Sequence, residues 1–230
     1  MNSACVWAPV LLLYYITDRW QFPGDALAKH HRLLAKIAEA AHAGVDYIQL
    51  RERDLTGREL EDLASEALLA IRRATAQPGT PRPQLLINSR TDVALAVGAD
   101  GVHLRSHDVS ADAARQIWSA CAAACGPGAA ARVTVAVSCH TVAEVRLAQV
   151  HGADFVVFAP VFEKSASDAQ PAGLAALRDA TRASIPVLAL GGITLENAAS
   201  CLEVGAAGVA AIRLFQENDI ARVASALCAT

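Results

Sequence analysis

The stretch Val97-Gly98-Ala99-Asp100-Gly101-Val102 joins the end of an expected helix to the start of an expected strand. Similar stretches occur three more times along the chain, as Ala43-Gly44-Val45-Asp46, His151-Gly152-Ala153-Asp154-Phe155 and Val204-Gly205-Ala206-Ala207-Gly208-Val209. A glycine just past the last turn of a helix adopts the left-handed conformation that reverses the chain. The repeat therefore predicts that one helix-to-strand unit is used several times.

Short apolar runs lie on either side of these junctions. They are nearly continuous in Val, Ile, Leu and Ala, which is typical of parallel strands covered on both faces. The expected strands are Leu11–Thr17, Val45–Arg51, Gln84–Ile87, Gly101–Leu104, Arg132–Val137, Asp154–Phe158, Ile185–Leu190 and Ala207–Ile212.

Longer segments with helical periodicity alternate with the strands. Between Leu60 and Ile71, for example, apolar residues recur at steps of three and four and form one stripe. The expected helices are Leu27–Ala43, Gly57–Ala74, Thr91–Val97, Ser110–Ala124, Thr141–His151, Ala172–Thr181, Leu195–Val204 and Asp219–Leu227.

Eight strand–helix pairs predict a closed barrel. The spacing of the expected strands is about 28 residues per unit, close to that of (β/α)8 barrels, which take about 250 residues in all. We therefore expect an α/β protein in which residues 1–230 form a single (β/α)8 TIM barrel, with no linker dividing the chain.

Composition excludes several classes of protein. The 230 residues carry 20 Lys+Arg against 23 Asp+Glu, a net charge of −3, and 53% of them are hydrophobic. A weakly acidic, apolar chain is neither disordered nor a typical nucleic-acid binder. The longest apolar run, Val10–Ile16, is far shorter than the about 18 residues of a membrane helix, and no basic residue precedes it.

We accordingly expect a cytoplasmic protein with no membrane or nucleic-acid partner, and its oligomeric state stays open, with a homo-oligomer allowed. The chain has six cysteines, which we expect to be buried reduced thiols. Their spacing does not match a zinc site, because Cys121 and Cys125 have no second pair.

Polar residues gather where the expected strands end. In a barrel of this kind the carboxyl ends of the strands form the functional face. Arginine is frequent among these residues, and a guanidinium suits phosphate and diphosphate groups. The strand ends are Thr17-Asp18-Arg19, Gln49-Leu50-Arg51-Glu52-Arg53, Asn88-Ser89-Arg90, His103-Leu104-Arg105-Ser106-His107-Asp108, Ser138-Cys139-His140-Thr141, Ala159-Pro160-Val161-Phe162-Glu163-Lys164, Gly191-Gly192-Ile193 and Ile212-Arg213.

The Gly191-Gly192 pair has two interpretations. Glycines after the seventh strand let backbone N–H groups approach a phosphate, and barrels commonly bind phosphate there. The pair could equally form a tight turn that only needs a positive φ.

Gln49, Arg51 and Arg53 alternate along the chain, so in an extended strand they face the same side. Two arginines directed inward need a counter-charge, because an unpaired buried charge is costly. A bound anion would supply that charge, and so would an ion pair with Glu52 or Asp18.

His140 follows the fifth expected strand and has the right pKa range for a general acid or base. A hydrogen-bonded structural histidine is the alternative. His103, His107 and Asp108 suggest a metal, but their spacing does not match a histidine-rich zinc motif.

Six stretches together resemble the thiamine phosphate synthase/thiazole tautomerase (TenI) family, in the correct order and over nearly the whole chain, from about Leu13 to Phe215. They are Tyr15-Ile16-Thr17-Asp18-Arg19, Gln49-Leu50-Arg51-Glu52-Arg53, Leu86-Ile87-Asn88-Ser89-Arg90-Thr91-Asp92-Val93-Ala94, Gly98-Ala99-Asp100-Gly101-Val102-His103-Leu104, Val137-Ser138-Cys139-His140-Thr141 and Ala189-Leu190-Gly191-Gly192-Ile193. The resemblance implies a (β/α)8 barrel. Synthases of the family join hydroxymethylpyrimidine diphosphate to thiazole phosphate and release diphosphate with the help of Mg²⁺. Tautomerases of the family bind a thiazole carboxylate phosphate and shift a proton.

The resemblance also implies roles for individual residues. It assigns Gln49, Arg51 and Asn88 to the pyrimidine diphosphate, Ser138 to the diphosphate, and Gly191 and Gly192 to the thiazole phosphate. His140 matches the histidine implicated in tautomerase proton transfer, and Asp108 matches a magnesium carboxylate.

Four positions depart from the pattern of the synthases. Ser89 stands where a second magnesium carboxylate is usual, and Arg53 replaces a lysine. After the sixth strand the expected lysine is missing, although Lys164 could reach in from three residues earlier. At the eighth strand Ile212 is followed by Arg213, where a small phosphate-contacting residue is usual. Arg53 and Arg213 would supply compensating cations or mark a changed ligand.

Three functions follow from these observations. A synthase is the main hypothesis, with Arg51, Arg53 and Asn88 stabilising the leaving diphosphate and Asp108 holding Mg²⁺. A thiazole tautomerase that uses His140 is the first alternative. A phosphate-ligand binding protein without catalysis is the second.

Overall fold

The computed structural model describes residues 11–125, 133–163 and 170–229. Eight parallel strands pair in chain order and close into a barrel, because β1 also pairs with β8. Each overlaps one of the strands expected from the sequence. The strands are β1 (Leu12–Ile16), β2 (Tyr47–Leu50), β3 (Gln84–Asn88), β4 (Gly101–Leu104), β5 (Thr134–Cys139), β6 (Phe155–Phe158), β7 (Val187–Leu190) and β8 (Gly208–Ala211).

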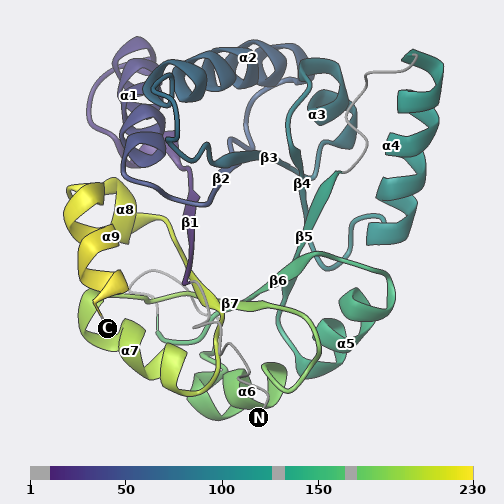
Figure 1. Cartoon of the computed structure of the whole chain (residues 1–230), viewed down its shortest axis with the longest axis vertical. Coiled ribbons are helices and arrows are strands. Elements are labelled where there is room, and N and C mark those ends of the chain that lie inside the picture. The colour runs from purple at the N-terminus through teal and green to yellow at the C-terminus, as the bar shows by residue number, and fades with distance from the viewer. Residues whose placement is uncertain (1–10, 126–132, 164–169, 230) are drawn as a thin grey trace, which may run out of the picture.

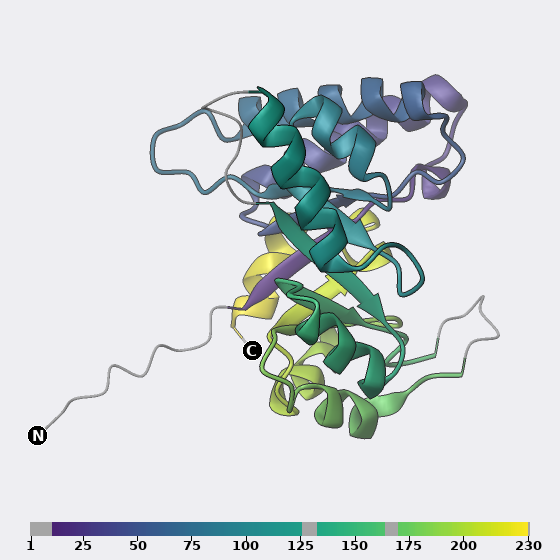
Figure 2. The same cartoon turned by 90° about the vertical axis from the view of Figure 1, so that its right-hand side faces the viewer.

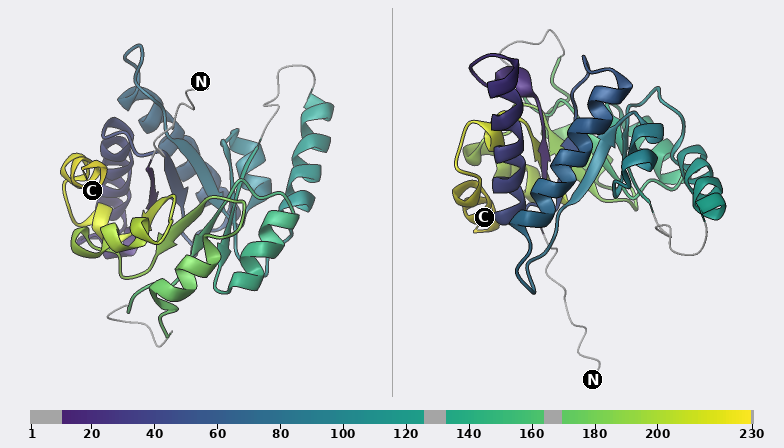
Figure 3. Two further views of the ribbon diagram at one scale, coloured as in Figure 1. Left: turned by 60° about the horizontal axis from the view of Figure 1, so that its bottom comes forward. Right: turned by 90° about the horizontal axis from the view of Figure 1, so that it is seen from above.

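Helices surround the barrel on the outside, as Figure 1 shows from one end and Figure 2 and Figure 3 show from other directions. They confirm the predicted alternation and the (β/α)8 fold. The helices are α1 (Ala26–His42), α2 (Gly57–Ala74), α3 (Thr91–Val97), α4 (Ala111–Cys125), α5 (Val142–Val150), α6 (Gly173–Ala180), α7 (Leu195–Glu203), α8 (Arg213–Gln216) and α9 (Ile220–Cys228), with a 3-10 turn η1 at Arg19–Gln21. Neither η1 nor α8 was predicted from the sequence.

The repeated glycines have the predicted conformation. Gly44, Gly98, Gly152 and Gly205 have φ values of 79°, 66°, 72° and 99°, in the left-handed region that favours glycine. Each therefore turns the chain from a helix toward the following strand.

The aspartates of the repeated stretch connect neighbouring strands, which the sequence analysis did not anticipate. Asp46 Oδ2 accepts a hydrogen bond from the Leu13 amide at 2.8 Å, Asp100 Oδ2 from the Leu85 amide at 2.8 Å, and Asp154 Oδ2 from the Val135 amide at 2.7 Å. Each carboxylate precedes one strand and reaches back to the strand before it. The fourth stretch has Ala207 at the corresponding position.

Two layers of apolar residues form the core. The larger layer lies between the strands and the helices. A smaller layer fills the barrel interior with Tyr14, Ile16, Leu86, Ala136, Phe155, Val157, Leu188 and Ala210. Because this interior is packed, a ligand has room only at the ends of the strands.

The cysteine prediction is partly wrong. Cys139 and Cys201 are buried, but Cys121 and Cys228 are exposed. The exposed pair lies on the outer helices α4 and α9, whose solvent faces tolerate a small thiol. Cys5 and the side chain of Cys125 lie outside the described residues. Among the helices that the structure describes, none is both long and apolar enough to cross a membrane.

Candidate active site

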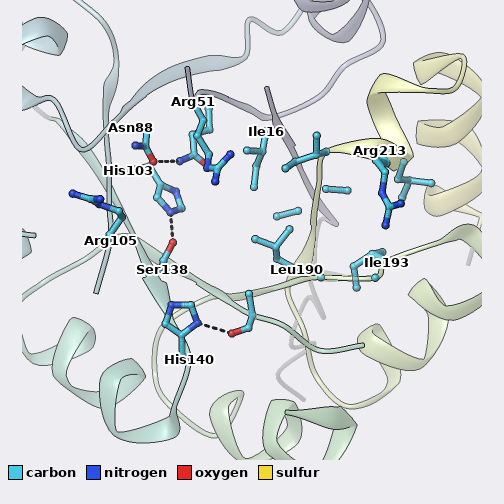
Figure 4. A pocket seen from close by; sticks show the side chains of 18 of the residues that line it. Ile16, Arg51, Asn88, His103, Arg105, Ser138, His140, Leu190, Ile193 and Arg213 are labelled. Carbon is cyan, nitrogen blue, oxygen red and sulfur yellow. Dashed lines mark hydrogen bonds between the residues drawn. The ribbon is translucent and has the colours of Figure 1, made fainter. Parts of the chain in front are cut away.

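A cavity of about 680 Å³ opens at the carboxyl ends of the strands (Figure 4). This volume lies within the range of small-molecule sites. Its polar lining consists of Gln21, Gln49, Arg51, Arg53, Asn88, His103, Arg105, Ser106, His107, Ser138, His140 and Arg213. Four of these side chains are arginines, and none is a carboxylate.

Most of the predicted site residues lie on this one cavity. They are Gln49, Arg51, Arg53, Asn88, Ser138, His140, Gly191, Gly192, Ile212 and Arg213. Lys164 lies outside the described residues. Arg90, expected at the same rim, is not among the lining residues and pairs with Asp92 at 2.6 Å. Asp108 lines a neighbouring, smaller pocket instead.

Arg51 and Arg53 have no carboxylate partner among the described residues. The candidate partner Glu52 faces away from them, where it accepts from Thr17 Oγ1 at 2.7 Å and from Arg19 Nη1 at 3.0 Å. The ion-pair interpretation of Arg51 and Arg53 is therefore wrong for Glu52. β2 ends at Leu50, so Arg53 lies in the following turn rather than in an extended strand, yet it still reaches the cavity.

The electrostatics of Arg51 also favour an anion. Partial burial and the positive charge of Arg53 lower the pKa of Arg51, and the negative charges of Asp18 and Glu52 offset this only in part. Two nearby guanidinium groups repel each other unless negative charge lies between them. A phosphate or diphosphate in the cavity would remove this repulsion.

Two amide side chains lie beside these arginines. Gln49 is buried and donates from Nε2 to Asn88 Oδ1 at 2.8 Å. The bond fixes both amides at the ends of β2 and β3, where they line the cavity. A fixed pair of amides can distinguish a polar heterocycle by its donors and acceptors.

His103 was considered from the sequence only as a possible metal ligand, whereas the structure places it in a hydrogen-bonded chain at the cavity. It lies in β4 with a neighbour on each side: Tyr14 Oη is 2.9 Å from Nδ1, and Ser138 Oγ is 2.7 Å from Nε2. Burial, together with the smaller effect of the Arg51 charge, lowers the pKa of His103 to about 3, so the ring is neutral. A neutral imidazole has one donor and one acceptor nitrogen, so this hydrogen-bonded chain orients the Ser138 hydroxyl at the cavity.

His140 lies immediately after β5 and is held by one nitrogen. Its Nδ1 is 2.7 Å from the carbonyl oxygen of Ala159 (Figure 4). Because a carbonyl only accepts, Nδ1 carries the hydrogen, and the neutral ring keeps a lone pair on Nε2. His140 can therefore take up a proton from a molecule in the cavity.

The Gly191-Gly192 turn supports both of its interpretations. The two residues have φ values of 102° and 65°, and a Cβ at Gly192 would lie 2.8 Å from the Cβ of Phe162. The turn therefore needs glycine for its conformation. Within the described ranges, the amides of Gly192 and Ile193 also have no protein acceptor, so they are available to a phosphate.

At the end of β8 the chain turns into the short helix α8. Ile212 precedes α8 and Arg213 is its first residue, rather than a continuation of the strand. Arg213 is exposed, lines the cavity, and has no ion-pair partner among the residues that the structure describes.

Asp108 is already saturated by its neighbours. Its Oδ2 accepts from Ser89 Oγ at 2.6 Å and from the Arg105 amide at 2.8 Å, and its Oδ1 accepts from Arg105 Nη2 at 2.8 Å. Burial alone would raise the pKa of Asp108, but the bonds from Arg105 and Ser89 hold it below its usual value. Asp108 is thus ionised and paired internally.

Comparisons with known proteins agree with this geometry. The family model described as thiamine monophosphate synthase matches residues 13–215. A thiamine-phosphate synthase of Methanoculleus marisnigri is 38% identical over 94% of this chain and 92% of its own, and one of Roseiflexus castenholzii is 40% identical over 87% of this chain and 79% of its own.

The solved structure of thiamine phosphate pyrophosphorylase from Pyrococcus furiosus superposes with a TM-score of 0.74 at 28% identity, covering 95% of this chain and 94% of that one. The family model covers β2 to β8 and all of β1 except its first residue. The chain therefore belongs to the thiamine monophosphate synthase family.

Proposed function

We propose that this protein joins hydroxymethylpyrimidine diphosphate to thiazole phosphate and releases diphosphate. The observation that carries the proposal is the cavity itself, in a chain of this family. It has four arginines and no described carboxylate, so it suits a ligand with two phosphorylated parts. Small phosphorylated substrates are the partners that the family implies. The expected cytoplasmic location stays a prediction, and the oligomeric state stays open.

In the proposed reaction the bond between the pyrimidine methylene carbon and the diphosphate oxygen breaks, and its electron pair leaves with the diphosphate. The thiazole nitrogen then donates its lone pair to that carbon and forms the new C–N bond. The developing negative charge lies on the diphosphate, so guanidinium groups stabilise the transition state more than the ground state. Arg51 and Arg53 are placed for this role, and Gln49 with Asn88 would hold the pyrimidine.

The second phosphate group needs its own contacts. Gly192 and Ile193 offer free amides, and Arg213 lies on the same side of the cavity (Figure 4). We assign the thiazole phosphate to this part of the site, and the diphosphate to the opposite part around Arg51 and Ser138. This separation would place the two reacting atoms between them.

The direct test incubates the protein with both substrates and measures thiamine phosphate. We expect product from the wild type and a decrease of about 10²–10³ in kcat/KM for Arg51→Gln, because one stabilising cation is lost. Arg222→Gln, on the exposed face of α9, is the matched control and should keep full activity. Absence of product under all conditions would reject the synthase.

A thiazole tautomerase is the second candidate, favoured by His140. Its anchored Nδ1 leaves Nε2 as a base at the cavity, and the proton shift needs no diphosphate. The test supplies thiazole carboxylate phosphate alone and follows its isomerisation. A His140→Ala variant that keeps full turnover would exclude this role, and tight binding of thiazole phosphate without either reaction would indicate a binding protein.

Magnesium, which the family resemblance implies at Asp108, is not well matched by the residues present. Ser89 offers no charge, and both oxygens of Asp108 accept hydrogen bonds from Arg105. Within the described ranges, no three acidic, histidine or cysteine side chains come together as a metal site. We therefore assign no step of the proposed reaction to a metal.

A further inference from the structure

An ion pair occupies the place between the ends of β3 and β4. Arg105, in the loop after β4, contacts Asp108 with its amide, its Nε and its Nη2, and Ser89 at the end of β3 adds a hydroxyl. Ser89 has a φ of 60°, which is uncommon for a residue other than glycine and directs the turn after β3. The three residues thus form one hydrogen-bonded cluster.

This cluster removes the negative charge that a divalent cation needs. Mg²⁺ is usually bound by one or two carboxylates together with phosphate oxygens and water. Position 89 supplies a hydroxyl that already donates to Asp108, and Arg105 neutralises the one remaining carboxylate. A cation placed there would have to displace the guanidinium.

The cavity beside this cluster carries further fixed positive charge. Arg51, Arg53 and Arg105 all line it, and among the described lining residues no carboxylate opposes them. The Arg105 side chain is half exposed, so its remaining N–H donors are accessible to a ligand. Figure 4 shows Arg105 beside His103 at the edge of the cavity, with its side chain extending away from Arg51 in this view.

We infer that guanidinium groups replace the divalent metal in this protein, so that it binds a diphosphate group and stabilises its departure without Mg²⁺. Arg105, oriented by Asp108 and Ser89, is the substitute cation, and Arg51 and Arg53 complete the charge. The inference rests on the proposed function, since it describes how that site handles its leaving group. The bonds made and broken are those of the proposed reaction, and the electron pair still leaves with the diphosphate.

The experiment measures binding of inorganic diphosphate to the full chain by calorimetry, with EDTA and separately with excess Mg²⁺. We expect affinities within about threefold of each other, because the guanidinium groups already supply the charge. In EDTA, Arg105→Ala should weaken binding by about 10- to 100-fold, which is the size of a lost charge-assisted hydrogen bond. Arg182→Ala is the control, because Arg182 forms a comparable i,i+3 pair with Asp179 but lies outside the cavity.

A double variant provides the converse test. Ser89→Asp with Arg105→Ala gives two carboxylates and removes the competing cation. Aspartate tolerates the positive φ of position 89 better than most residues, so the turn is kept. We expect diphosphate binding by this variant to be weak in EDTA and to tighten at least about tenfold with Mg²⁺.

The outcomes separate this inference from the proposed function. Thiamine phosphate formed equally in EDTA and Mg²⁺ supports both, and product formed only with Mg²⁺ overturns the inference alone. Metal-independent diphosphate binding without product supports the inference and rejects the synthase. Diphosphate binding that requires Mg²⁺ in the wild type, or an Arg105→Ala variant that binds like wild type, overturns the inference.

Discussion

The buried residue His103 connects the packed interior of the barrel to the cavity. His103 lies between a core tyrosine and a serine of the cavity, so the packed layer inside the barrel and the ligand site share one hydrogen-bonded chain. From the sequence, His103 was considered only as a metal ligand whose spacing does not match a zinc motif. A residue within a strand carries no local signal of its partners, because Tyr14 and Ser138 come from distant parts of the chain.

Replacement of Tyr14 by Phe should affect both stability and binding. It leaves a buried imidazole nitrogen without a partner, which costs about 1–3 kcal/mol of unfolding free energy. It also frees the ring that orients Ser138, so diphosphate affinity should fall by about 3- to 10-fold. Urea denaturation and calorimetry would measure the two effects.

Tyr15→Phe is the matched control. Tyr15 is equally buried and donates to Gln216 Oε1 at 2.9 Å, but it belongs to the outer core layer. The Tyr15→Phe variant should lose stability but keep its affinity for diphosphate. Equal losses of affinity in both variants would contradict the role given to the His103 chain.

The pKa of His103 predicts a dependence of stability on pH. The folded ring has a pKa of about 3, whereas an unfolded histidine titrates near 6.5. Between these values the unfolded chain binds a proton that the folded chain does not, so stability falls as the pH falls below about 6.5. Protonation of His103 in the unfolded chain should lower the free energy of unfolding by about 2 kcal/mol at pH 5.

Unfolding of wild type and His103→Gln in urea, at pH 7 and pH 5, isolates this contribution. All other titrating groups are common to both chains. The wild type should lose about 2 kcal/mol more than the variant over this interval. Identical losses would show that His103 is not the titrating group.

At the level of the secondary-structure elements, the repeated aspartates bind each strand to its predecessor. The glycine of each repeat was predictable from its place after a helix, but the aspartate was not, since its acceptor role depends on which strand lies next to it. The carboxylate of Asp46 meets an amide of β1, where Leu13 is buried. These bonds lie at the end of the barrel opposite the cavity and hold the strands in register.

Asp46→Ala should destabilise the protein without affecting its site. The Leu13 amide loses its acceptor in a buried position, so the unfolding free energy should fall by about 1–3 kcal/mol. Asp46→Asn keeps an acceptor oxygen and should lose less. Chemical denaturation measures both, and an Ala variant as stable as the Asn variant would contradict this role.

For the molecule as a whole, the fold and most of the residues that line the cavity could be predicted from the sequence. Continuous apolar runs and helix-ending glycines predicted eight units, and parallel strands place their carboxyl ends on one face by geometry alone. Which charged side chains form ion pairs with one another was not predictable from the sequence. Glu52 pairs with Arg19 rather than with the adjacent arginines, and Arg105 closes on Asp108. Such pairings depend on loop conformation, which local sequence does not encode.

The pairing of β1 with β8 has a consequence for how the molecule is made. Leu12 and Gly208 are register partners although about 200 residues separate them. At a synthesis rate of about 5–20 residues per second, the first strand is complete about 10–40 s before its partner exists. During that interval one edge of the growing sheet has no neighbour. The barrel therefore cannot close between β1 and β8 until β8 has been synthesised.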